Sequence, residues 1–243
     1  MNVRPTLTLG RVLQILIAAD AIARLISDSW LAARLRDGTF VMHMADPNGP
    51  PETAYWTGTS VAGLSSLTNL TGLAAIVVWL FWQHRATENL WARGYTGLRV
   101  RPGWAVGWWF IPVAWWFMPC VSMLELDRRS TPDGEPRRAH PLIGAWWAAW
   151  LAFQLVPLIG GIWAVAGPLG DVVQRIDERT TVIDFSLAAH AIAPWVQVAG
   201  LLVVVAGALA IAVVRRVDAA QAAMLQTPSE SWRPVPVRPD VIA

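Results

Sequence analysis

Residues 103–124 read GWAVGWWFIPVAWWFMPCVSML, a stretch without charge that is long enough to cross a membrane as a helix. Pro112 and Pro119 each remove a backbone hydrogen-bond donor, and Gly103 and Gly107 weaken the start of the stretch, so a straight helix is disfavoured. Freed backbone groups survive at membrane depth only where protein or water satisfies them. The stretch therefore predicts a hairpin that enters and leaves on one face, with a proline-kinked spanning helix as the alternative.

Three more uncharged runs, residues 53–84, 139–170 and 185–214, flank this stretch. They predict spanning helices at 61–83, 142–166 and 186–214. A weaker helix is expected at 9–27, where Arg11, Asp20 and Arg24 interrupt the apolar pattern; residues 1–23 could instead form a cleaved signal peptide. The predicted fold is an all-α integral membrane protein with four transmembrane helices plus a Trp/Pro-rich re-entrant or interfacial helical segment.

The same runs divide the chain into four parts. Residues 1–27 hold the N-terminus and the weak helix, and residues 28–60 form an extracytoplasmic loop with breakers at 47–51. Residues 61–214 form the membrane core. Residues 215–243 form a cytoplasmic tail, with a short helix near 216–226 and a Pro-rich end that is expected to be disordered.

The arginines indicate the orientation, because cytoplasmic loops carry an excess of basic residues. If all five segments cross, the basic residues divide 8 inside against 10 outside, which is no bias. If segment 103–124 returns to the face it left, they divide 14 inside against 4 outside. The count favours the re-entrant interpretation, with both termini in the cytoplasm and the protein in a bacterial cytoplasmic membrane.

Composition excludes several classes of protein. Hydrophobic residues make up 55% of the chain and charged residues only 15%, whereas a soluble domain of this size usually carries about 25% charge. A net charge of +2, with arginines spread among the loops, gives no basic face for nucleic acid. The single cysteine, Cys120, excludes an intrachain disulfide.

A family resemblance rests on the segment around the proline-rich stretch. The run from Trp82 to Ser130 is similar to a bacterial membrane family, mostly actinobacterial, known as the domain of unknown function 4328, and the similarity covers roughly residues 60–220. The resemblance implies a multi-pass membrane protein without an assigned activity. The chain departs from the family pattern at Trp115 (usually Asn), Cys120 (usually Tyr) and Leu124 (often Arg). The residues that carry the resemblance are Arg85, Asn89, Pro102, Gly103, Trp104, Gly107, Trp109, Phe110, Pro112, Pro119, Glu125 and Arg128.

Four polar residues inside the expected helices form a candidate intramembrane site. They are Asp20 and Arg24, four apart on one helix, and His190 and Gln197 on another. Ionisable groups at membrane depth are functional candidates, so these residues suggest a transport path. The alternatives are a self-neutralising ion pair for the first two and hydrogen-bonding contacts between helices for the others.

A second candidate surface combines tryptophans with arginines. The tryptophans of segment 103–124 lie between two arginine-bearing loops, which describes an aromatic surface with a cationic rim. Each arginine near an anionic leaflet contributes about 1 kcal/mol, so headgroup contact is expected; anchoring and orientation alone are the simpler interpretation. The candidate headgroup contacts are Arg128, Arg129, Arg137 and Arg138.

No enzyme motif and no strong metal motif occurs in the sequence. Met42-His43-Met44 could suit copper, but one such triplet without a partner cluster is weak. No cofactor, no metal and no catalytic residue is therefore expected. The leading functional hypothesis is a non-enzymatic scaffold or regulatory protein whose inner Trp/Arg surface contacts anionic lipid or a protein partner. The alternative is a small transporter or channel.

Overall fold

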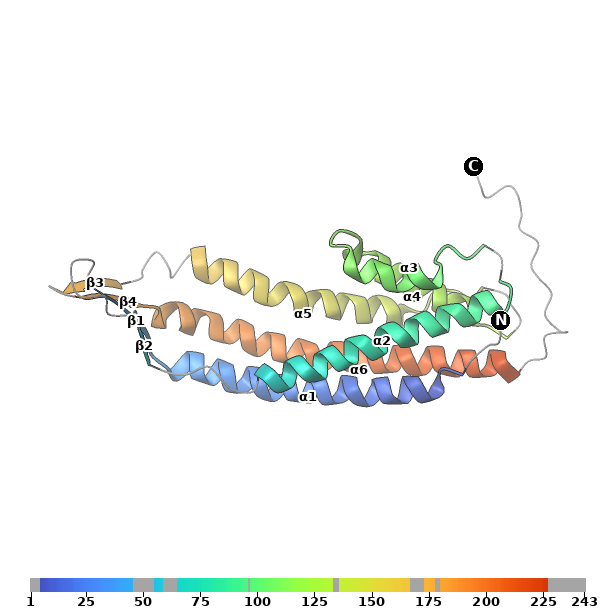
Figure 1. Ribbon diagram of the computed structural model, residues 1–243, viewed down its shortest axis with the longest axis horizontal. Helices are drawn as coiled ribbons and strands as arrows, with labels where there is room; N and C mark the ends of the chain where they lie inside the picture. Colours follow the sequence, from blue (N-terminus) through green and yellow to red (C-terminus); the bar gives the residue numbers. More distant parts are fainter. Residues whose placement is uncertain are drawn as a thin grey trace. The chain divides into compact units, whose positions relative to one another are not determined.

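The computed structural model describes residues 5–45, 55–58, 65–95, 97–132, 136–166, 173–177 and 180–226. Four long helices dominate this part of the chain (Figure 1): α1 (Leu7–Asp37), α2 (Ser65–Ala92), α5 (Pro141–Ala166) and α6 (Ser186–Gln226). The prediction of a mainly helical protein is confirmed. Two of the helices in the described residues, α5 and α6, are long and apolar enough to cross a membrane.

The stretch 103–124 is not one helix. It is divided among α3 (Pro102–Gly107), the 3-10 turns η1 (Trp108–Phe110) and η2 (Ala114–Trp116), and α4 (Met118–Arg129). The chain turns back at η1 and η2, so that α3 packs against α4 (Figure 1). We call residues 102–129 the aromatic hairpin.

The prolines of the aromatic hairpin explain where its helices begin and end. Pro102 and Pro119 occupy the first turns of α3 and α4, where a missing N–H costs no intrahelical hydrogen bond. Pro112 lies in the exposed turn between η1 and η2, where it prevents one helix from continuing into the next. The prolines therefore delimit short helices and do not kink a long one.

The ends of three long helices lie beyond the predicted ones. α1 was expected at 9–27 but continues to Asp37, so the first ten residues of the predicted loop 28–60 are helical. α2 continues past residue 83 to Ala92 and ends in a glycine cap at Gly94, which has a φ of 79°. Tyr95 N bonds to Leu90 O and Gly94 N to Trp91 O, which is the Schellman arrangement. α6 was expected to stop at 214 before a separate short helix, but it runs unbroken to Gln226.

A small antiparallel sheet was not predicted. Its strands are β1 (Phe40–Ala45), β2 (Tyr55–Gly58), β3 (Val173–Asp177) and β4 (Thr180–Asp184), in the order β2-β1-β4-β3. β1 pairs with β4 so that Val41 lies opposite Asp184 and Ala45 opposite Thr180. The sheet thus joins two connections that are far apart in the sequence, one of which was expected to be only a loop.

The structure separates into two compact units. Unit 1 comprises residues 1–20, 70–149 and 206–243, and unit 2 comprises residues 21–69 and 150–205. The aromatic hairpin belongs wholly to unit 1 and the sheet to unit 2. The closely packed side chains of unit 1 include Leu13, Trp82, Leu90, Met123 and Val213.

Apolar side chains also cover the outer faces of the helices. In unit 1, α2 exposes Leu70, Leu73, Val77 and Phe81, whose spacing of three and four residues makes one continuous stripe. In unit 2, α6 repeats the pattern with Val198, Leu201 and Val205, and α5 with Leu155, Leu158 and Ile162. Exposed apolar stripes of this extent are typical of surfaces covered by lipid or protein.

Candidate functional site: a buried polar network beside an aromatic hairpin

A buried carboxylate lies in unit 1, on α6. Asp218 is only 3% exposed, and its Oδ1 accepts hydrogen bonds from Thr6 Oγ1 at 2.7 Å and Trp82 Nε1 at 2.9 Å. These donors offset part of the cost of placing a carboxylate away from water. Gly10 of α1 approaches so closely that an added Cβ would overlap the carboxylate, which explains the glycine at this position.

One turn further along α6, an amide pair links α6 to α2. Asn89 Nδ2 donates to Gln221 Oε1 at 2.9 Å, and Gln221 Nε2 donates to the carbonyl of Ala86 at 2.8 Å. All three residues are buried. The pair satisfies two side-chain amides at once and fixes the register of the two helices in this unit.

A second amide, Gln83 of α2, connects the long helices to the aromatic hairpin. Its Oε1 accepts from Trp79 Nε1 at 3.0 Å and from Trp109 Nε1 at 2.9 Å. Its Nε2 is buried and has no hydrogen-bond partner among the described residues. Gln83 therefore holds η1 of the hairpin against the middle of α2.

Five tryptophans pack around this amide, contributed by α2, η1 and α5. Ring centroids are 5.1 Å apart for Trp79 and Trp146, 5.4 Å for Trp79 and Trp82, and 6.1 Å for Trp109 and Trp147. Aromatic pairs at such distances contribute about 0.5–1.5 kcal/mol each beyond the area they bury. The cluster fixes the hairpin to the long helices of unit 1 by packing as well as by hydrogen bonds.

The other end of the aromatic hairpin is held by an ion pair. Arg216 Nε donates to Asp127 Oδ1 at 2.7 Å; the Asp127 side chain is 0% exposed and that of Arg216 28%. Glu125 accepts from the backbone N–H groups of Arg99 and Val100, at 2.8 and 2.9 Å, and so orders the segment leading into α3. Asp127 Oδ2 is buried without a hydrogen-bond partner in the described part of the chain.

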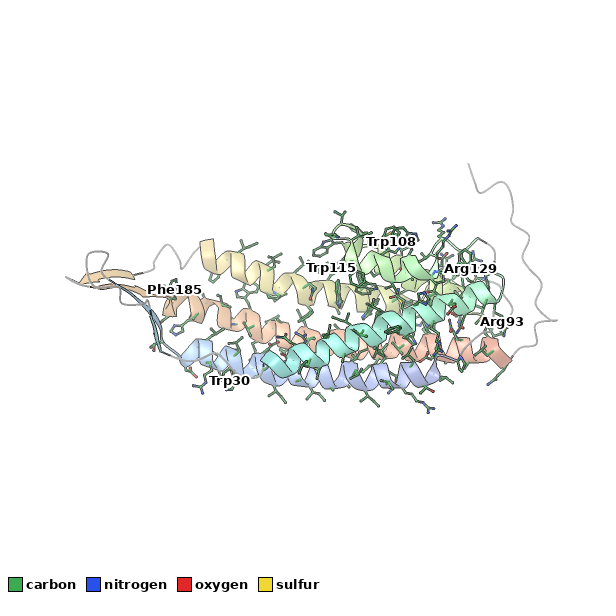
Figure 2. All side chains as sticks on the ribbon, in the orientation of Figure 1. Trp30, Arg93, Trp108, Trp115, Arg129 and Phe185 are labelled. Atoms are coloured by element: carbon green, nitrogen blue, oxygen red, sulfur yellow. The ribbon has the colours of Figure 1, made fainter. Side chains whose placement is uncertain are left out.

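The outer surface of the aromatic hairpin is strongly apolar at its turn. Phe110, Val113 and Phe117 are 70%, 76% and 66% exposed. Trp104 stacks on Trp108 with a centroid distance of 4.6 Å. Figure 2 shows Trp108 and Trp115 on the hairpin, together with Arg129 at the end of α4. Apolar and cationic side chains are thus segregated along the hairpin.

The four arginines proposed as headgroup contacts do not have equivalent surroundings. Arg137 donates from its guanidinium to the carbonyl of Ser130, and its own carbonyl accepts from Arg128 Nε at 3.3 Å. Both residues therefore also stabilise the connection after α4. Arg128 and Arg138 are exposed, whereas Arg129 and Arg137 are half-buried.

Of the four residues of the candidate intramembrane site, Asp20 belongs to unit 1 and the other three belong to unit 2. Asp20 accepts from Thr71 Oγ1 at 3.0 Å in unit 1. In unit 2, Gln197 Nε2 donates to Ser29 Oγ at 3.3 Å, and His190 Nε2 lies 3.3 Å from the carbonyl of Gly38. Arg24, a half-buried residue of α1, also lies in unit 2. Each hydrogen bond links two segments that are distant in the sequence.

The structure brings together only some of the residues that carry the family resemblance. Asn89, Trp109 and Glu125 make the hydrogen bonds described above, and Pro119 is buried at the start of α4. The others lie outside the network: Arg85, Pro102, Gly103, Trp104, Gly107, Phe110, Pro112 and Arg128 are half-buried or exposed. Trp115, a position of departure from the family, stacks on Trp116 at 5.5 Å.

Sequence reasoning missed most of the network. The residues not predicted are Trp79, Gln83, Asp127, Arg216, Asp218 and Gln221. A usable signal was present, because Val214, Val217, Gln221 and Met224 continue a helical stripe of buried positions beyond the arginines.

No group of three or more His, Cys, Asp or Glu residues able to hold a metal occurs in the described residues. The copper triplet, Met42-His43-Met44, lies on β1, and its side chains are outside the described part of the structure.

The described part of the chain is mainly helical, carries apolar side chains on its outer faces, and contains two helices long and apolar enough to cross a membrane, which suggests membrane association. The chain belongs to the family described as Domain of unknown function (DUF4328), whose family model matches residues 45–219. The family predicted from the motif is therefore confirmed. No curated protein and no solved structure matches the chain.

Proposed function

We propose that this protein is a multi-pass scaffold or regulatory protein of the bacterial cytoplasmic membrane, without enzymatic activity. In this proposal α1, α2, α5 and α6 span the bilayer, both termini are cytoplasmic, and the aromatic hairpin enters from the cytoplasmic face. The hairpin and its arginines form the surface that contacts anionic lipid headgroups or a protein partner. The apolar stripes on the outer faces of the long helices support the four spans.

The observation that carries this proposal is the separation of charge and aromatic groups along the aromatic hairpin. Its base lies level with the end of α2, because Tyr95 Oη donates to the carbonyl of Thr131 at 2.7 Å. Its turn lies beside Gln83, nine residues before the end of α2 at Ala92. At 1.5 Å per residue this is a displacement of roughly 14 Å, about half of a hydrocarbon core.

This geometry suits a segment that binds the inner leaflet. Arginines at the base reach the level of the phosphates, while aromatic and aliphatic side chains near the turn lie deeper. With the hairpin re-entrant, the arginines divide 14 against 4, which supports a cytoplasmic position for the base. The exposed Arg128 and Arg138, at about 1 kcal/mol each, would favour anionic lipids there.

Energy transfer from tryptophan to lipid provides the test. The chain is reconstituted in phosphatidylcholine nanodiscs with a small fraction of dansyl-labelled phosphatidylglycerol or dansyl-labelled phosphatidylcholine. We expect greater transfer to the anionic probe and loss of that preference in Arg128→Gln/Arg129→Gln/Arg138→Gln. The variant keeps Arg137, whose guanidinium donates to the carbonyl of Ser130, and loses only the longer bond from Arg128 Nε to the carbonyl of Arg137.

The matched control is Arg34→Gln/Arg36→Gln, which removes positive charge from the last turn of α1. This variant should keep the preference for the anionic probe. Equal transfer to both probes in the unmodified chain, or equal losses in the two variants, would contradict the proposal.

A transporter or channel remains the second candidate, favoured by the half-buried carboxylate of Asp20 in α1 and its hydrogen bond to Thr71 of α2. This candidate predicts that Asp20→Asn and His190→Ala abolish ion or solute flux in proteoliposomes while the protein still folds. The scaffold proposal predicts that both variants are silent in flux and in lipid preference. A flux that these two substitutions remove would decide for transport.

A further inference from the structure

The turn of the aromatic hairpin carries more exposed apolar surface than headgroup binding requires. Phe110, Val113 and Phe117 are each about two-thirds exposed or more, and all belong to unit 1. None of the three side chains is charged or polar, so their exposure to water is unfavourable. A cover for this surface has to be apolar.

The hairpin cannot cover these side chains by folding closer to the long helices. Its inward positions are already occupied: Trp109 bonds to Gln83, and the carbonyl of Trp116 accepts from Trp147 Nε1 at 3.3 Å. The ion pair between Asp127 and Arg216 fixes the far end. The exposed side chains alternate with these contacts along the chain and therefore belong to the outward side.

The position of the turn along α2 indicates what covers its apolar side chains. Beside the turn, α2 carries the exposed apolar stripe of Leu73, Val77 and Phe81. The exposed side chains of the hairpin therefore lie next to a part of α2 whose outer face is also apolar. The base, roughly 14 Å away along α2, carries the arginines. A diacyl phospholipid has the same two parts in the same order, an anionic headgroup and apolar chains below it.

We infer that the aromatic hairpin is a binding site for a whole anionic phospholipid, with the arginines at its base on the phosphate and Phe110, Val113 and Phe117 on the acyl chains. This inference rests on the proposed function and specifies its ligand. A soluble phosphate or a free headgroup would meet only the base. The site therefore selects a membrane lipid over a soluble anion of the same charge.

A fluorescent label at the turn tests the acyl-chain part. Cys120→Ser/Val113→Cys carries an environment-sensitive label, and the protein is placed in nanodiscs with chain-brominated phosphatidylglycerol or chain-brominated phosphatidylcholine. The matched control is Cys120→Ser/Ala139→Cys, which labels an exposed position beyond the base. We expect chain quenching at 113 and not at 139, and aqueous iodide quenching at 139 and not at 113.

The headgroup part is read from the difference between the two brominated lipids. Occupancy of the site by the anionic lipid should exceed that by phosphatidylcholine at least about fivefold, since one arginine contributes about 1 kcal/mol, so quenching at 113 should be stronger with the anionic lipid. Arg128→Gln/Arg129→Gln/Arg138→Gln should remove this difference, and added glycerol phosphate should not compete.

The outcomes separate this inference from the proposed function. Quenching at 113 by iodide and not by brominated chains overturns the inference, even if the arginines still prefer anionic lipid. Equal chain quenching by both lipids keeps the turn in the hydrocarbon but contradicts anionic selectivity, which is the failure of the proposed function. Competition by glycerol phosphate shows that a soluble anion suffices and also overturns the inference. Phe110→Ser/Phe117→Ser, which leaves the inward contacts in place, should weaken chain quenching at 113.

Discussion

At the scale of single residues, the buried position of the Asp218 carboxylate requires a glycine on α1, the helix opposite it. A helical glycine normally costs up to about 1 kcal/mol relative to alanine. At Gly10 the absence of Cβ leaves the space that the carboxylate occupies while it accepts from Thr6 and Trp82. The local cost of the glycine is therefore offset by a buried polar contact between α1 and α6.

Gly10→Ala tests this contact. The added methyl group overlaps the Asp218 carboxylate, so we expect a loss of about 1–3 kcal/mol in the free energy of unfolding, typical of overpacking. Unfolding in mixed detergent micelles, followed by circular dichroism, measures it.

Gly144→Ala is the matched control, because nothing lies within 4 Å of a Cβ added at that helical position. It should be neutral or stabilising by up to about 1 kcal/mol. Equal stability of the two variants would show that the close approach at Gly10 is unimportant.

At the scale of elements, the aromatic hairpin is held at both ends by contacts of different kinds. Tryptophans and Gln83 hold its turn, and one ion pair holds its base. The two partners of that pair differ in burial. Asp127 is fully buried, whereas Arg216 is partly exposed and can reach water when its partner is removed.

The ion pair therefore predicts an asymmetry between two substitutions. Arg216→Ala leaves a buried carboxylate without its cation and should cost about 3–5 kcal/mol, the range for breaking a buried pair. Asp127→Asn leaves a cation that water can solvate and should cost clearly less. Chemical unfolding of both variants and of the double variant checks this; a larger loss for Asp127→Asn would contradict the assigned burial.

The aromatic hairpin, α6 and the sheet show which elements can be predicted from the sequence. The prolines and glycines of 103–124 predicted a break because their effect on the backbone is local. The end of α6 was predicted wrongly because Arg215 and Arg216 look like a membrane boundary, whereas the helix continues and buries Asp218 and Gln221. The sheet could not be predicted because β1 and β4 pair across more than 130 residues of sequence.

The candidate site was predictable only in part for a related reason. Asn89 and Trp109 were identified through the family motif, but nothing local indicates that Asn89 meets Gln221 or that Trp109 meets Gln83. These are contacts between distant segments, and they form only when the helices have packed. Residue type alone made Asp218 look like part of a solvated tail.

At the scale of the whole molecule, the central claim concerns how often the chain crosses the membrane. Apolar stripes lie outward on the long helices, and the aromatic hairpin turns back within the unit that also contains the arginine-rich connections. If the hairpin re-enters, its two flanking segments share one side of the membrane. This single fact decides whether its arginines and its apolar turn can act on one leaflet.

Cysteine accessibility in intact cells tests that claim most directly. In a Cys120→Ser background, single cysteines replace Arg101 before the hairpin, Ala139 after it, or Arg36 in the last turn of α1. All three positions are exposed. With a membrane-impermeant thiol reagent, we predict that Arg36→Cys reacts in intact cells, whereas Arg101→Cys and Ala139→Cys react only after lysis. Reaction of Ala139→Cys from outside, with Arg101→Cys protected, would show that segment 103–124 spans the membrane and would contradict the account.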